Sequence, residues 1–229
     1  MPSIRVTALL ILLAVAMAAN QSVYAKTVRT AFSSLPEIEK AIGAKGHIIF
    51  VDTARKEFSV KSFNAAGNLV VEVVGSEQYG YTLTRYGGDA KLKKVIDTVV
   101  VDAKENKVVV TTSNRNALND WLTKYMEALV KGVGVTKSAV SPEEYTEYGE
   151  KCAKDYFFCA LLAGPIGQVI CFAKLLFCMA QAPDVSYNWT VTDEHCGRDG
   201  CKEGEKCCDT GKCVKRNTPC PTPDFGEPR

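Results

Sequence analysis

The sequence predicts an α+β domain, an antiparallel sheet with packed helices, followed by a disulfide-stapled helical hairpin and a small disulfide-rich module. Two observations lead to this class. Residues 26–140 contain no cysteine, and their apolar residues recur first at strand spacing and then at helical spacing. All ten cysteines lie at or after Cys152, in a group of four and a group of six. The first part is long enough to bury a core unaided, whereas the shorter later parts need cross-links.

Composition narrows the function classes before any motif is considered. Hydrophobic residues make up 46% of the 229 residues and charged residues 24%, which is typical of a folded globular chain. A formal net charge of +2 gives no electrostatic reason to expect nucleic acid as a partner. Only two histidines are present, so histidine-based catalysis and histidine-rich metal sites have little material. We therefore expect no enzyme activity, no cofactor and no metal site.

Residues 1–25 have the pattern of a secretory signal peptide. Arg5 lies in a short positive start, and an apolar run over 6–19 follows it. The tripeptide Val-Tyr-Ala that ends at Ala25 suits signal peptidase, and Ala18 ends a rival site. The apolar run has about 14 residues, fewer than the roughly 20 that span a bilayer, which argues against the alternative of an uncleaved anchor. The sequence thus predicts a secreted protein whose cysteines are oxidised.

Residues 26–140 show alternating strand and helix signals. Ser34 and Glu37 are spaced as a capping box, with Ser34 as the N-cap of a short helix that reaches about Ala44. β-branched and alternating segments then predict an antiparallel sheet, and a helical apolar spacing predicts one long amphipathic helix. The expected strands cover 47–53, 57–63, 68–74, 79–84, 96–101 and 107–112, and the expected helix covers 116–133.

No catalytic or nucleotide-binding motif occurs in this first domain. His47 opens a predicted strand, and we expect it to have a solvent or backbone partner. Four aromatic residues could line a ligand groove, although core packing is the simpler interpretation; they are Tyr79, Tyr81, Tyr86 and Trp121. The domain could act as a binding domain or as a pro-region that keeps the rest inactive. An enzyme with an unrecognised site here is the remaining alternative.

Residues 141–182 predict two antiparallel helices. Ser141 caps the first, and Gly164-Pro165 interrupts the helical pattern before a second, largely apolar stretch. Within each arm the two cysteines are seven residues apart, which places them on one helix face two turns apart. If the chain folds back at the Gly-Pro break, cysteines at matching heights on the two antiparallel helices come together. We therefore expect nested bridges between Cys152 and Cys178 and between Cys159 and Cys171. The plan resembles the stapled helical hairpins of small defence peptides.

The apolar character of this hairpin leaves three interpretations open. Residues 157–180 carry one charge, Lys174, and are long enough to cross a bilayer. The segment could pack on the first domain, insert into membranes as a toxin, or anchor the protein in a membrane. Its small, cysteine-bearing apolar composition is similar to that of halocin-type bacteriocins. Membrane lipid is therefore a possible partner, and a membrane-active antimicrobial protein is an alternative function.

Residues 183–195 form a predicted linker, and a module over 196–220 follows it. Asn188 begins an Asn-Trp-Thr glycosylation sequon, which has meaning only in a eukaryotic source. The six cysteines of the module are spaced C-x4-C-x5-C-C-x4-C-x6-C, and other apolar residues are almost absent from it except Val214. A segment this polar cannot fold by burial alone, so covalent links must replace the core. No zinc site is expected, because C-x2-C is missing and exported thiols are normally oxidised.

The adjacent pair Cys207-Cys208 and its spacing resemble the inhibitor cystine knot, or knottin, family. The resemblance covers 25 residues and implies bridges that join Cys196 to Cys208, Cys201 to Cys213 and Cys207 to Cys220. A granulin-like or whey-acidic-like fragment is the alternative. The family's use in channel block, protease inhibition and defence implies that the module binds an extracellular protein.

Three basic residues, Lys212, Lys215 and Arg216, are the candidate binding residues of the module, although nearby acidic residues offset their charge. The tail over 221–229 is expected to be extended. The sequence as a whole predicts a secreted, disulfide-rich, non-enzymatic binding or toxin-like effector protein, with a role in defence among the possibilities.

Overall fold

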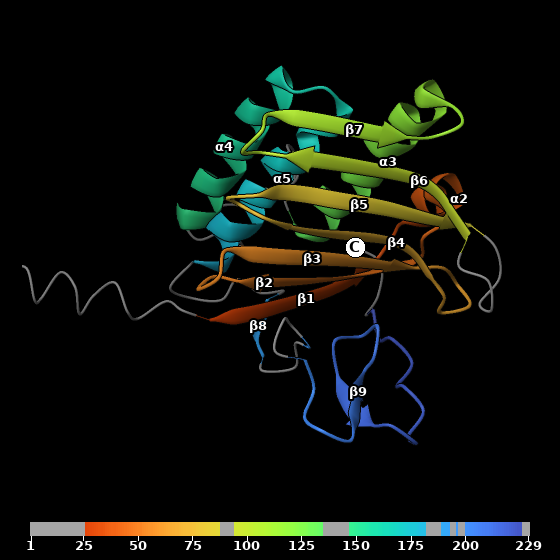
Figure 1. The fold of residues 1–229 in the computed structure, drawn as a ribbon. Coiled ribbons are helices and arrows are strands. Elements are labelled where there is room, and N and C mark those ends of the chain that lie inside the picture. The colour runs from red at the N-terminus through yellow and green to blue at the C-terminus, as the bar shows by residue number, and fades with distance from the viewer. Residues whose placement is uncertain are drawn as a thin grey trace, which may run out of the picture.

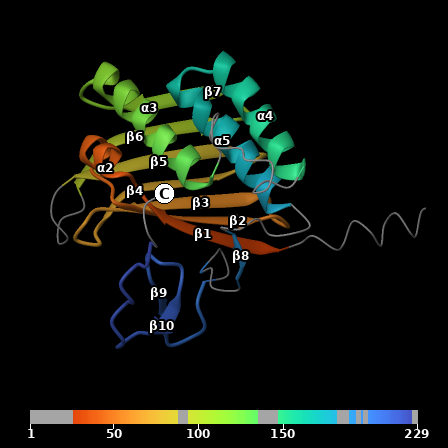
Figure 2. The same ribbon diagram turned by 180° about the vertical axis from the view of Figure 1, so that it is seen from behind.

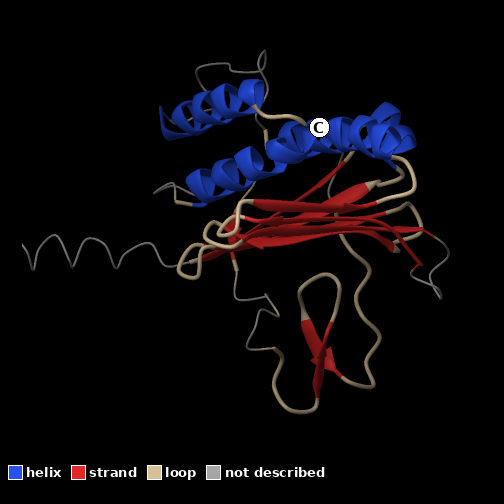
Figure 3. Cartoon of the chain, turned by 45° about the horizontal axis from the view of Figure 1, so that its top comes forward, coloured by secondary structure: helices blue, strands red, loops and turns tan. Residues whose placement is uncertain are grey.

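The computed structural model describes residues 26–87, 94–134, 147–181, 189–192, 196 and 200–225. The expected signal peptide, the helix start at Ser141 and the sequon residue Asn188 lie outside these residues. The described chain forms three layers: helices, a large antiparallel sheet beneath them, and a small cysteine-rich module on the opposite side of the sheet (Figure 3). The expected α+β class and the disulfide-stapled C-terminal region are both present.

Eight strands form one antiparallel sheet in the order β7-β6-β5-β4-β3-β2-β1-β8, so seven of them follow the chain as a meander (Figure 1). Strands at the predicted positions occur because β-branched residues alternate there or run continuously. Their bounds are β2 Gly46–Asp52, β3 Glu57–Phe63, β4 Leu69–Ser76, β5 Gly80–Gly87, β6 Lys94–Asp102 and β7 Lys107–Thr111.

Two strands of the large sheet have no counterpart in the sequence-based prediction. β1, Thr27–Ser33, pairs along its whole length with β2, and β8, Thr190–Val191, pairs with the other side of β1. β8 lies within the segment interpreted as a linker, and the neighbouring Trp189 is buried in the core. The chain therefore returns to the first strand of the sheet before it enters the cysteine-rich module.

The first helix corrects the capping prediction. α2, Pro36–Ile42, has Leu35 as its N-cap residue, with no side-chain cap bond, and its C-cap is Gly43 in the left-handed region at φ 73°. Pro36 occupies the first helical position, where a missing N–H costs nothing. Ser34 is not the cap, because its hydroxyl is bonded instead to His47 on the neighbouring strand β2.

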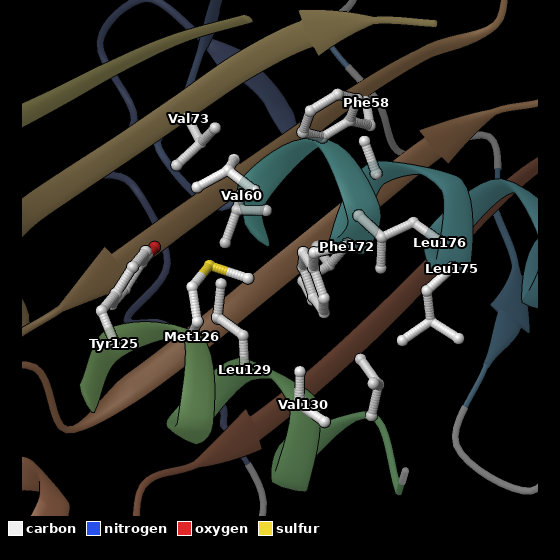
Figure 4. Close-up of a cluster of buried hydrophobic side chains, with 14 of the residues drawn as sticks. Phe58, Val60, Val73, Tyr125, Met126, Leu129, Val130, Phe172, Leu175 and Leu176 are labelled. Atoms are coloured by element: carbon white, nitrogen blue, oxygen red, sulfur yellow. The ribbon is translucent and has the colours of Figure 1, made fainter. Parts of the chain in front are cut away.

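The main core lies between the inner face of the sheet and two helices seen in front of it in Figure 2. α3, Arg115–Gly132, begins at the N-cap Asn114, whose side chain accepts a hydrogen bond from the Ala117 N–H at 3.1 Å. Figure 4 shows how side chains from the sheet, α3 and α5 (Pro165–Ala180) meet there: Phe58, Val60 and Val73 from the sheet, Tyr125, Met126, Leu129 and Val130 from α3, and Phe172, Leu175 and Leu176 from α5.

The apolar hairpin is docked on this core. α4, Glu147–Leu162, and α5, Pro165–Ala180, meet at the predicted Gly-Pro break. α5 contacts both α3 and the sheet, and the Tyr81 hydroxyl donates to the carbonyl of Ile166 at 2.7 Å. Most of the apolar length of α5 is therefore used for packing. None of the helices within the described residues has the length and apolarity needed to cross a membrane.

Candidate functional site

All ten cysteines are paired, which is the feature that governs the C-terminal half. In the hairpin, Cys152 bonds to Cys178 and Cys159 to Cys171, with Cα atoms 5.6 and 5.7 Å apart. These are the two nested bridges that the seven-residue spacing predicts. Five disulfides are typical of proteins that work in an oxidising, extracellular environment.

The bridges of the terminal module correct the knottin pairing. Cys201 bonds to Cys213 as the resemblance implies, but Cys196 bonds to Cys207 and not to Cys208. The remaining bridge joins Cys208 to Cys220. Successive side chains of an extended segment point to opposite faces, so only one member of the adjacent pair faces Cys196. The register of the local ladder, in which Cys207 lies opposite Cys213, selects Cys207.

The module is a two-stranded ladder held on a disulfide frame. β9, Glu205–Cys207, pairs antiparallel with β10, Cys213–Lys215. The connecting turn closes through a backbone bond of 2.9 Å from the Gly211 N–H to the carbonyl of Cys208. Its sulfur atoms lie close together: the Sγ of Cys196 is 3.5 Å from the Sγ atoms of Cys201 and Cys213. Groups of three potential metal ligands in this module consist mostly of these cysteines, which are bound in disulfides and so are not thiolate ligands.

One side of the module faces the large sheet. Cys208, Thr210 and Gly211 are buried in the turn, and the Asp209 carboxylate lies 3.9 Å from the Lys61 ammonium on β3. The ladder strands themselves project away from the sheet (Figure 3). The disulfide frame thus presents a defined outer surface while its turn is held against the body of the protein.

The three predicted binding residues are all exposed on that module, but they do not form one cluster. Lys215 lies opposite Glu205 in the ladder, so an acidic side chain faces it. Strand alternation places Arg216 on the other face, where Val214 lies opposite Lys206. Sequence reasoning missed Lys206. The turn residues between Cys208 and Cys213 carry the signal for this pairing, because they imply a hairpin.

A buried polar chain in the first domain is the other chemically notable feature. His47 is fully buried and bonds through Nε2 to the Ser34 hydroxyl at 2.7 Å and through Nδ1 to the Ser62 hydroxyl at 2.8 Å. The Ser62 hydroxyl also bonds to the Tyr125 hydroxyl at 2.8 Å. The predicted solvent or backbone partner of His47 is therefore wrong, because two hydroxyls satisfy the ring inside the core.

His47 is uncharged within this buried chain of hydrogen bonds. Burial lowers the pKa of His47 to about 3 and raises the pKa of Tyr125 above its ordinary value. A general base needs a pKa near the working pH and a reacting proton within reach. The pKa of His47 is far from a neutral working pH and its ring is fully buried, so the arrangement fits a structural polar link between α3 and the sheet.

An ion pair lies on the same cross-strand row of the sheet as His47 and Ser62. The Arg85 guanidinium is 2.6 Å from the Asp97 carboxylate and 4.7 Å from the centre of the Trp121 ring. Trp121 in turn stacks on Tyr125, with ring centres 4.9 Å apart, and donates from Nε1 to the carbonyl of Ile42 at 3.1 Å. Strand pairing places Arg85 opposite Asp97, and the packing of α3 on the sheet adds Trp121, so no local motif could have indicated the whole cluster.

The four aromatic residues considered as a ligand groove are separated in the structure. Tyr81 and Trp121 are buried beneath the helices. Tyr86 packs with a different cluster on the outer face, and Tyr79 is exposed beside the ammonium of Lys104 at 4.1 Å. The core interpretation holds for Tyr81 and Trp121, and the four do not line one groove.

A search of protein-family models, of curated proteins and of solved structures finds no match to this chain.

Proposed function

We propose that this protein is an exported, non-enzymatic binding protein, of the toxin-like effector or defence kind, whose cysteine module contacts an extracellular protein. The observation that carries the proposal is the placement of the module. Three disulfides fix its frame, and its β9–β10 surface faces solvent with Lys206, Val214 and Arg216 on one side. A covalently fixed frame loses little entropy on binding, which favours a recognition role.

Export is part of the same proposal and has its own support. Five disulfides are typical of an oxidising compartment, and residues 1–25 carry the sequence pattern of a signal peptide. Expression in a secreting host, followed by intact-mass analysis of the medium, tests it. We expect a product that begins at Lys26, or at Ala19 for the rival cleavage site, with no titratable thiol. Retention of the chain inside the host in reduced form would contradict export.

The binding proposal is tested by comparing variants of the whole oxidised protein. Labelled wild type is applied to extracellular fluids and cell surfaces with cross-linking, beside Lys206→Ala/Arg216→Ala and a matched control, Lys104→Ala/Lys107→Ala, on the β6–β7 turn. We expect a partner whose cross-linked yield falls about tenfold in the module variant and stays unchanged in the control, because arginine is enriched among interface hot spots. Equal loss in both variants, or in neither, would reject the module as the contact.

A second candidate, membrane activity, is favoured by one specific observation. Phe158, Leu161 and Leu162 near the end of α4 are 71%, 75% and 79% exposed. Exposed Lys151 and Lys174 lie on the same hairpin and suit an anionic lipid surface. The nested bridges hold the hairpin closed, so contact with lipid would be interfacial.

Vesicle flotation tests this candidate with the full chain. Liposomes with anionic headgroups are expected to carry wild type upward, and Phe158→Ser/Leu161→Ser/Leu162→Ser should abolish flotation. A matched control, Val74→Ser/Val108→Ser/Val109→Ser, removes three valines of 46–50% exposure from the sheet and should float like wild type. Wild type that stays at the bottom of the gradient would exclude the membrane candidate.

A further inference from the structure

The outer face of the sheet carries a second apolar cluster, separate from the core beneath the helices. Successive residues of β2 serve the two clusters: Ile49 and Val51 belong to the main core, whereas Ile48 and Phe50 belong to the outer one. Phe63 and Leu69 complete it, and all four side chains are buried. We refer to these four residues together with Gly46 as the aromatic cup.

A side chain from the far end of the chain fills this cup. Phe225, beyond the last bridged cysteine, packs against the cluster, and its ring centre lies 5.5 Å from that of Phe63. The ring sits directly over Gly46: a Cβ added there would come within 2.1 Å of the Phe225 ring. Gly46 has no left-handed φ, so its lack of a side chain serves this close approach and not the backbone.

The contacts that attach the module to the sheet differ in kind from those that fix its own structure. Inside the module, three covalent bridges fix the frame. Toward the sheet, the module contributes noncovalent contacts: the buried turn of Cys208, Thr210 and Gly211, the partly exposed Phe225 ring, and the Asp209 carboxylate 3.9 Å from the Lys61 ammonium. β9 and β10 contact each other much more than they contact any strand of the large sheet. The five residues from Pro221 to Phe225 contain no cysteine, so the Phe225 ring is held on the sheet without a covalent bond.

We propose that Phe225 is a latch: it occupies a receptor site for an aromatic side chain, and an extended segment carrying such a side chain can replace it and release the module. While Phe225 is in place, the Cys208–Gly211 turn is turned toward the sheet and the β9–β10 surface is presented to solvent. Release would uncover both the aromatic cup and that turn. The latch does not depend on what the module binds, and its test requires no knowledge of the partner.

Relaxation of ¹⁵N amides in the full oxidised chain tests the latch. In wild type, residues 200–220 should tumble with the sheet. Phe225→Ala empties the cup and Gly46→Ala blocks it, so both should give the module a shorter correlation time than the sheet. Gly164→Ala, where an added Cβ meets open space, is the matched control and should behave as wild type. A module that still tumbles with the sheet in both variants would overturn the proposal.

A peptide titration tests the receptor site itself. The probe is the capped hexapeptide Pro-Thr-Pro-Asp-Phe-Gly, which copies residues 221–226, and the receptor is the Phe225→Ala protein. We expect saturable shifts of the Gly46 and Phe63 amides with this peptide and none with the matched peptide that has alanine in place of phenylalanine. Added to wild type, the same peptide should increase the mobility of the module. Identical responses to both peptides, or none, would show that the cup does not recognise an aromatic side chain.

Discussion

The polar chain through His47 shows how single residues are accommodated in an apolar core. Each ring nitrogen has a serine hydroxyl as partner, and the second of these hydroxyls also bonds to Tyr125. Hydroxyls can donate or accept, so they satisfy a neutral ring in either tautomer. A charged ring would gain no anionic partner from these hydroxyls, and this is why burial governs its pKa.

Acid should therefore destabilise the protein through His47. An unfolded histidine takes up a proton below about pH 6.5, whereas the folded one does so only near pH 3. Between these values the unfolded state binds more protons, so stability falls as the pH is lowered from 6.5 toward 3. The loss from this one group should reach about 3 kcal/mol at pH 4.5. Urea unfolding of wild type and His47→Gln at pH 7 and 4.5 measures this loss. An equal loss of unfolding free energy in the two proteins would contradict the prediction.

Ser62 should matter more than Tyr125 in this chain. Ser62→Ala leaves both His47 Nδ1 and the Tyr125 hydroxyl buried without their common partner, and should cost about 2–3 kcal/mol of unfolding free energy. Tyr125→Phe removes one end of the chain and keeps the bond between Ser62 and His47, so its cost should be about 1 kcal/mol. Chemical denaturation at neutral pH compares the two, and the reverse order would show that the chain is not coupled through Ser62.

At the scale of elements, the packing of the hairpin explains why its sequence is so apolar. α5 is apolar nearly all round because the sheet, α3 and α4 all cover it, as seen for Phe58 and Phe177, whose rings meet edge to face at 6.1 Å. α4 has fewer neighbours, so part of its apolar surface stays exposed near Phe158. Core packing therefore accounts for the apolar composition of α5. The exposed apolar residues of α4 are the part of the hairpin that could contact a membrane.

The two hairpin bridges should differ in their contribution to stability. Loop-closure entropy grows with the length of chain that a bridge encloses. The separation is 26 residues for Cys152–Cys178 and 12 for Cys159–Cys171. Replacing the first pair with serines should cost about 3.5 kcal/mol and the second about 3 kcal/mol. Each pair has one fully buried member, so the comparison is balanced, and thermal melts of both double variants can rank them.

Local patterns predicted the elements that depend on local patterns. The 57–63 strand and the long helix near 116–133 lie where periodicity indicated, because alternating and helical apolar faces each match a buried side. β8 has two residues and exists only because β1 offers an unpaired edge, so no local signal marks it. Ser34 has a capping pattern but bonds across the sheet. The cysteine spacing of the hairpin predicted its disulfide pairing. In the terminal module, spacing alone could not show which of the adjacent cysteines 207 and 208 bonds to Cys196, because that depends on the register of the β9–β10 ladder.

At the scale of the whole molecule, stability comes from two different sources. The sheet domain has a continuous apolar core with no cysteine in its own strands β1 to β7. The terminal module has sulfur where another domain has apolar side chains. The protein thus joins a part that folds by burial to a part that folds by oxidation.

Reduction should separate these two parts. Under a strong reductant at neutral pH, amide protons of residues 200–220 should lose their protection from exchange, while β2 to β6 keep theirs. The hairpin bridges will also open, so the unfolding temperature of the sheet domain should fall without its collapse. Hydrogen exchange with mass spectrometry follows both regions in one sample. Simultaneous loss of protection in the sheet strands would contradict independent sources of stability.

The pairing of β8 with β1 also determines when the fold can be completed during synthesis. The Thr190 hydroxyl donates to the carbonyl of Arg29, a contact between residues 161 positions apart. The edge of β1 that β8 covers must therefore wait until most of the polypeptide has left the ribosome. Contacts this distant slow folding and leave an open edge on the nascent chain in the meantime. A secreting cell would have to shield that edge until translation is nearly finished.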